Sequence, residues 1–171
     1  PTSRIWMHGA RLSVSSASIE RVVDEETDET ESVPSSWEPA EREGIAALRI
    51  ARELPAGDVT ILIAYEAPYD RQLKGLYRVD VGEDHYAFTQ FEATSARYAF
   101  PSFDEPRWKT PFDVSLTVHR EHVAVANSRE LERVLHENGL DRVRYATTLP
   151  LPTYLVAMAV GPLDVVEAPA I

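Results

Sequence analysis

Apolar and polar residues alternate over short stretches along most of this chain, which is the pattern of β-strands. The clearest example is residues 112–118, where Phe112, Val114, Leu116 and Val118 alternate with polar residues. We expect strands over residues 4–8, 12–23, 45–51, 59–66, 76–81, 85–92, 112–119, 123–126, 129–136, 142–148 and 154–160. Glycine and proline separate many of these stretches, and none has the period of a long helix. The pattern therefore predicts an all-β fold, a mostly antiparallel β-sandwich or curved pair of sheets.

One acidic segment interrupts the alternation. Residues 20–43 hold ten acidic and two basic residues, so this segment carries a charge of −8 and the rest of the chain only −3. Over residues 24–43, with Pro34 and Pro39, we expect a solvated loop or insertion pinned to the sandwich by Trp37. Trimming this loop should leave folding nearly intact. An acidic patch for a basic partner or a calcium site are alternatives, but the spacing of an EF-hand is absent.

Length and composition limit the other possibilities. The 171 residues fit a single domain over residues 1–171, which can bury about two thirds of its unfolded surface without a disulfide or metal. Cysteine is absent, and the net charge of −11 argues against nucleic acid or an anionic membrane as a partner. No apolar run is long enough to span a bilayer. Because the chain begins with Pro1, we expect it to be a segment of a longer protein.

The best candidate site lies at the end of the strand predicted over residues 85–92. Tyr86, Phe88, Gln90 and Glu92 share one face of that strand, which starts aromatic and ends in an amide and a carboxylate. The amino terminus of a peptide has a pKa near 8 and is largely an ammonium ion at neutral pH. A carboxylate held by a rigid strand suits that ion. Alternation alone favours the alternative, that the two residues merely cap the strand.

Two adjacent acids, Asp104 and Glu105, form a second candidate for acid–base chemistry. Adjacent residues of an extended segment point apart, and Pro106 fixes a turn, so a structural corner is the better interpretation. Three basic residues lie near enough in the sequence to pair with these acids: Arg97, Arg107 and Lys109.

Histidines offer a third candidate. His119 and His122 are spaced for a shared helical face, but they are expected where a strand runs into a loop, and the sequence places no third ligand. We therefore expect a solvated loop there. His8 is expected to be a strand residue rather than a ligand.

The segment around the first candidate resembles a known family. Residues 89–116, TQFEATSARYAFPSFDEPRWKTPFDVSL, are similar to part of the N-terminal domain of M1-family zinc aminopeptidases of the aminopeptidase N type. Three further segments extend the resemblance over nearly the whole chain: LPAGDVTILIAYEA (54–67), LKGLYR (73–78) and TTLPLPTYLVAMAVGPLDVV (147–166).

This resemblance implies a saddle-like β-sandwich and a role for the candidate residues. In the family, the position of Glu92 anchors the amino group of the substrate, and that of Gln90 lies beside the pocket for the first side chain. The FDEP corner around Asp104 resembles a structural feature of the family.

Two motifs of the family are missing from the 171 residues: the zinc-binding His-Glu-x-x-His and the substrate-binding Gly-Ala-Met-Glu-Asn type. In M1 enzymes both lie in the domain that follows. The resemblance therefore implies zinc bound outside this segment, and a C-terminal catalytic domain of the same polypeptide and a peptide substrate as partners. We expect no catalytic residue or metal ligand here, and an isolated segment that is inactive and lacks its first strands. Alternatives are a non-catalytic interaction or scaffold domain of an M1-like protein, or the epoxide-hydrolysing branch of the family.

Overall fold

In a computed structural model, the chain is described over residues 1–24, 29–40, 42 and 44–166. It forms two compact units, one of Pro1–Pro68 with Ser95–Asp104 (unit 1) and one of Tyr69–Thr94 with Glu105–Ile171 (unit 2). Every pairing between the named strands is antiparallel, and the described helices are two short 3-10 turns, so the all-β prediction is confirmed. The expectation of one single domain stays a prediction. No helix in the described ranges is long and apolar enough to cross a membrane.

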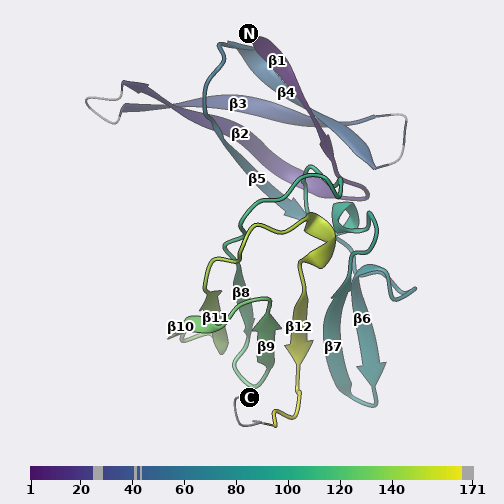
Figure 1. Cartoon of the computed structure of the whole chain (residues 1–171). Helices are drawn as coiled ribbons and strands as arrows, with labels where there is room; N and C mark the ends of the chain where they lie inside the picture. Colours follow the sequence, from purple (N-terminus) through teal and green to yellow (C-terminus); the bar gives the residue numbers. More distant parts are fainter. Residues whose placement is uncertain (25–28, 41, 43, 167–171) are drawn as a thin grey trace. The chain divides into compact units, whose positions relative to one another are not determined.

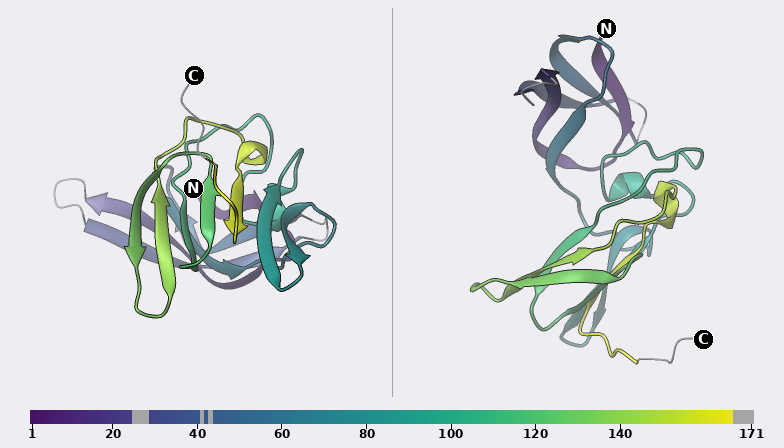
Figure 2. Two further views of the ribbon diagram at one scale, coloured as in Figure 1. Left: turned by 90° about the horizontal axis from the view of Figure 1, so that it is seen from below. Right: turned by 60° about the vertical axis from the view of Figure 1, so that its left-hand side comes forward.

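Unit 1 is built on one five-stranded sheet with the order β1-β4-β3-β2-β5 (Figure 1). Its elements are β1 (Thr2–His8), β2 (Ser13–Asp24), β3 (Glu29–Pro39), β4 (Ile45–Leu54), β5 (Thr60–Glu66) and the 3-10 turn η1 (Ala96–Tyr98). The sheet is strongly curved, as the purple and blue strands in Figure 2 show. Alternate residues build its core, formed by Met7, Ile19, Val33, Leu48, Ile50 and Leu54.

The acidic segment contains the central strand of this sheet, so the prediction of a loop is wrong for residues 29–39. β3 pairs with β2 on one side and β4 on the other, with Val33 opposite Ile19 and Trp37 opposite Leu48. Val33 is only 3% exposed, and Trp37 packs half-buried against the same core. Trimming residues 24–43 is therefore expected to remove a central strand rather than a loop; residues 25–28, 41 and 43 lie outside the described part of the chain.

Arginines of neighbouring strands neutralise the acidic side chains of β3. Glu31 forms ion pairs with Arg21, at 3.2 Å, and with Arg52. Glu38 accepts a hydrogen bond of 2.7 Å from Arg49, which lowers the pKa of that carboxyl group. A strand rich in carboxylates can therefore occupy the middle of the sheet, because its charges meet opposite charges across the strand pairs.

Unit 2 contains two smaller sheets, with the orders β10-β11-β8 and β6-β7-β12-β9. The elements are β6 (Gly75–Val81), β7 (Asp84–Gln90), β8 (Ser115–His119), β9 (Val123–Ala126), β10 (Glu130–Leu135), β11 (Leu140–Tyr145), the 3-10 turn η2 (Thr153–Leu155) and β12 (Met158–Gly161). A core cluster is formed by Val118, Ala124, Val143 and Tyr145. β6 and β7 form a hairpin whose turn includes Gly82 at φ +62°, a conformation that favours glycine.

Several predicted strand boundaries differ from the structure. The stretch predicted over 154–160 begins as η2 and becomes a strand only at Met158, because Pro152 lacks an N–H for a ladder and starts the turn. The stretch predicted from residue 112 is a strand only from Ser115, and the one predicted over 85–92 ends at Gln90.

Candidate functional site

Gln90 and Glu92 lie at the end of β7 in unit 2. Gln90 is the last residue of the strand and pairs with Gly75 of β6, whereas Glu92 lies in the turn that follows. The alternation continues past the strand end, because the side chains of Gln90 and Glu92 are exposed while Phe91 between them is 1% exposed. The backbone therefore presents the amide and the carboxylate to solvent on either side of a buried aromatic anchor.

The backbone N–H of Glu92 donates a hydrogen bond of 3.2 Å to Oε1 of Gln90. This contact joins the two candidate residues directly. Within the described ranges, the Glu92 carboxylate takes part in no ion pair. It is therefore a carboxylate that can accept a cationic group without first losing a partner.

An aromatic row leads to this position along the same face of the hairpin. The rings of Tyr86 and Phe88 are stacked, with centroids 6.3 Å apart and planes at 6°. Tyr77 of β6 lies across from Phe88, with the ring centroids 5.9 Å apart. Aromatic cross-strand pairs stabilise a hairpin, so this row stabilises the strand that carries Gln90.

On its other side, β7 is joined to β12 by a side-chain hydrogen bond, and the segment before β12 is held by Asn127. The N–H of Met158 donates to Oγ1 of Thr89 at 2.9 Å. Asn127, just after β9, accepts a hydrogen bond of 2.7 Å from the N–H of Ala157 and donates one of 2.9 Å to the carbonyl of Leu155. Sequence reasoning missed both Asn127 and the anchoring role of Phe91. An asparagine directly after a predicted strand was the available signal for the first, since this residue type often bonds to backbone groups.

Asp104 and Glu105 do not form a pair of catalytic carboxylates. The Asp104 side chain is fully buried, and its Oδ2 accepts hydrogen bonds from Nε of Arg97 at 2.8 Å and from the Arg97 N–H at 3.2 Å. Glu105 is bound by Arg107 at 2.8 Å on the surface, whereas Lys109 forms no ion pair with any described residue. The expectation of a structural corner fits this geometry.

Arg97 joins Asp104 to the segment between β1 and β2 of unit 1. Its Nη2 donates to the carbonyl of Asp104 at 2.9 Å, and its own carbonyl accepts from the N–H of Ala10 at 2.8 Å. Gly44, at φ +83°, leaves room for the side chain, since an added Cβ would lie 2.9 Å from Cδ of Arg97. The N–H of Asp104 donates to Nδ1 of His8 at 3.1 Å, so this nitrogen serves as a hydrogen-bond acceptor within the fold.

No group of three or more histidine, cysteine or acidic side chains that could hold a metal occurs among the described residues. His119 and His122 lie with their ring centroids 5.5 Å apart, across a turn in which the N–H of His122 donates to the carbonyl of His119. This pair has no third ligand in the described part of the chain. The described residues therefore do not supply a ligand set for zinc.

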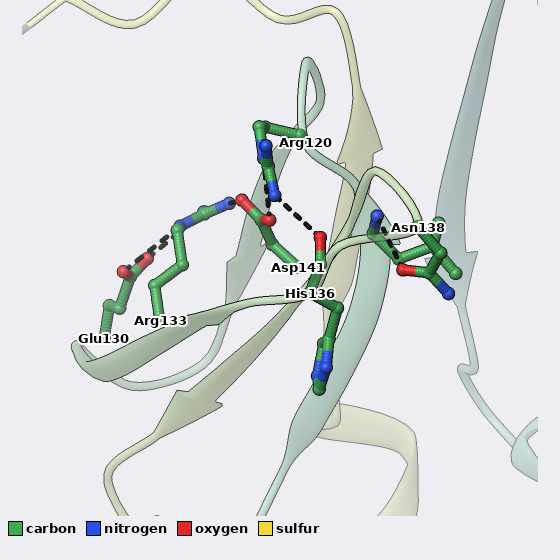
Figure 3. A network of polar contacts seen from close by, with 7 residues as sticks. Arg120, Glu130, Arg133, His136, Asn138 and Asp141 are labelled. Carbon is green, nitrogen blue, oxygen red and sulfur yellow. Dashed lines mark hydrogen bonds and ion pairs between the residues drawn. The ribbon is translucent and has the colours of Figure 1, made fainter.

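A second buried carboxylate, Asp141 of β11, lies in the small sheet of unit 2 (Figure 3). Arg120 contacts it at 3.2 Å and Arg133 at 3.6 Å, and Arg133 also pairs with Glu130. Nη2 of Arg120 donates to the carbonyl of His136 at 2.8 Å. The network neutralises the buried charge and links β10, β11 and the turn after β8, so its role is structural.

An open cavity of about 560 Å³ lies beside the β6–β7 hairpin in unit 2. It is lined by Tyr69, Asp70, Arg71, Arg78 and Asp80. A hydrogen bond from Arg78 lowers the pKa of the Asp80 carboxyl group, and His85 contacts both side chains. Arg78, Asp80 and His85 already contact one another. This cavity is therefore a weaker candidate for binding a substrate than the position of Gln90 and Glu92.

The sequence matches a known family model, Peptidase M1 N-terminal domain, over residues 1–155. Similar proteins include endoplasmic reticulum aminopeptidase 1 of Rattus norvegicus, 35% identical over 94% of this chain and 18% of that protein. Aminopeptidase M1-A of Oryza sativa subsp. japonica is 33% identical over 98% of this chain and 19% of its own length. The puromycin-sensitive aminopeptidase of Caenorhabditis elegans is 30% identical over 98% and 18%. The chain thus spans less than a fifth of these relatives.

Proposed function

The chain belongs to the peptidase M1 family, as an N-terminal domain, and from this premise we propose that it anchors the substrate in a zinc-dependent aminopeptidase that removes N-terminal residues from peptides. The observation that carries the proposal is the Glu92 carboxylate, exposed and without an ion-pair partner among the described residues, next to the buried Phe91. In this proposal Glu92 binds the substrate ammonium, and Gln90 lies beside the pocket for the first side chain.

Charge matching supports this assignment. The amino terminus of a peptide is mostly an ammonium ion at neutral pH, and it loses water when it enters a binding site. A carboxylate on a backbone that the fold already holds replaces that water at a lower entropic cost than one on a mobile chain. Binding through the ammonium would select the first residue of a chain, because internal residues have no such charge.

The zinc and the general base are proposed to come from elsewhere. M1 peptidases are zinc-dependent, and the described residues of this chain hold no metal-binding group. We assign these groups to a C-terminal catalytic domain of the same polypeptide, which this chain would cover. The isolated chain should then leave peptides uncleaved.

Changing Glu92 to glutamine in the full-length protein is expected to lower kcat/KM for a chromogenic aminoacyl amide by roughly 30-fold. This corresponds to about 2 kcal/mol, the lower end of the cost of removing one member of a charge pair, here one that the bound substrate would bury. Glu83→Gln, at the turn of the same β6–β7 hairpin, removes an exposed carboxylate away from the site and serves as the matched control. It should retain wild-type kinetics, and a zinc chelator should abolish cleavage by all three proteins.

Two outcomes would contradict the proposal. Equal kinetics for Glu92→Gln and the wild type would show that Glu92 does not anchor the substrate. A folded, zinc-loaded full-length protein that cleaves no aminoacyl amide would instead favour the non-catalytic scaffold.

A further inference from the structure

The position of Glu92 is not fixed by the sheet itself. The ladder with β6 ends at the pair Gln90 and Gly75, and that with β12 includes no residue of β7 beyond Phe88. Among the described residues, Glu92 lies in a turn and has no strand-pairing partner. Something other than sheet pairing must therefore hold the backbone from which the carboxylate projects.

Two contacts contribute to this restraint. The side chain of Phe91, at 1% exposure, anchors the chain between the two polar residues. The amide oxygen of Gln90 then accepts the N–H of Glu92 at 3.2 Å, two residues along the chain. The buried ring fixes where the chain leaves the core, and the hydrogen bond fixes the orientation of the next peptide group.

The same hydrogen bond orients the Gln90 amide. A glutamine side chain offers an oxygen that accepts and an NH₂ group that donates. With the Glu92 N–H as donor, only the oxygen can face it, because the NH₂ group would oppose another donor. One lone pair of that oxygen is thus committed to the backbone of Glu92, and a role limited to lining a pocket would not require this contact.

We propose that Gln90 is a positioning residue for Glu92: its amide oxygen holds the Glu92 backbone so that the carboxylate meets the ammonium group of the substrate. This inference rests on the proposed function and adds Gln90 as a residue that acts through Glu92. An exposed hydrogen bond of this kind is modest in strength, so we expect an effect of roughly fivefold on recognition of the ammonium.

The test uses the full-length protein and a pair of substrates that differ only at the amino group. One is an aminoacyl amide, and the other is the α-hydroxyacyl amide, in which a neutral hydroxyl replaces the ammonium. The ratio of their kcat/KM values, the amine preference, reports on the contact with Glu92 and is insensitive to a general loss of folded enzyme. Gln90→Met and Gln90→Leu remove the acceptor, and Gln90→Glu keeps an oxygen there.

Gln90→Met and Gln90→Leu should each lower the amine preference by roughly fivefold, and Gln90→Glu should preserve it. In a Glu92→Gln background, Gln90→Met should cause no further loss, because the hydrogen bond acts only through the carboxylate. Thermal midpoints should stay unchanged, since the Gln90 side chain is exposed.

The inference is overturned if Gln90→Met lowers the amine preference equally in both backgrounds, which would indicate direct contact with the substrate. It is also overturned if Gln90→Met and Gln90→Leu keep the wild-type preference. If instead Glu92→Gln keeps the wild-type amine preference, the proposed function fails first and this inference fails with it, so the two failures have different signatures.

Discussion

Replacing Val33 by aspartate is expected to lower the free energy of unfolding of unit 1 by more than about 4 kcal/mol. Val33 is 3% exposed at the centre of the five-stranded sheet, opposite Ile19 of β2. Losing the burial of a valine side chain costs about 1.5–3 kcal/mol, and placing a carboxylate in apolar surroundings adds to this. Urea unfolding of the 171-residue chain, followed by tryptophan fluorescence, to which Trp37 of the same strand contributes, measures the change.

Ser36→Asp is the matched control, because it adds the same charge to the same strand on an exposed position opposite Arg49. Its effect should stay within about 0.5 kcal/mol. If both variants unfold at the wild-type urea concentration, residues 29–39 behave as a loop and do not form the central strand.

β3 shows why part of the fold could not be predicted from the sequence. The strand over residues 115–119 was predictable because Leu116 and Val118 alternate with polar residues. In β3 the residues on the core face are Val33, Ser35 and Trp37, so a serine interrupts the apolar period of two. The acidic composition masked the two apolar positions, because the arginines that pair with Glu31 and Glu38 lie on the neighbouring strands β2 and β4, and strand pairing is not visible in the sequence pattern.

For the candidate site, the sequence predicted which residues lie together but not how they are held. Alternation placed Gln90 and Glu92 on one face at the end of the predicted strand, and in the structure both side chains are exposed. Which ligand the two residues bind stays a prediction. The burial of Phe91 and the hydrogen bond from the Glu92 N–H to Gln90 depend on where the chain leaves the sheet, and a periodic pattern does not encode this.

Asparagine in place of Asp104 is expected to lower the free energy of unfolding of unit 1 by about 3–5 kcal/mol. The Asp104 side chain is 0% exposed and that of Arg97 is 16% exposed, so the variant leaves a largely buried guanidinium without its counter-ion. Oδ2 of Asp104 also accepts the Arg97 N–H, and this contact would be lost where the amide NH₂ replaces the oxygen. Urea unfolding of the same chain measures the loss.

Glu105→Gln tests burial as the cause of that loss. Glu105 and Arg107 form an ion pair with the same N–O distance, 2.8 Å, as Asp104 and Arg97, but their side chains are 42% and 70% exposed. Breaking an exposed pair costs less than about 1 kcal/mol. Equal losses for Asp104→Asn and Glu105→Gln would contradict the argument, because distance alone would then set the cost.

A double variant separates the orphaned charge from the lost contact. Arg97→Met with Asp104→Leu removes both charges and keeps apolar volume, and replacing a buried pair in this way is often neutral or stabilising. We expect the double variant to recover most of the stability lost by Asp104→Asn. Failure to recover would show that the hydrogen bonds removed in the double variant, from Arg97 Nη2 to the Asp104 carbonyl and from the Arg97 N–H to Oδ2, matter more than the unpaired buried charge.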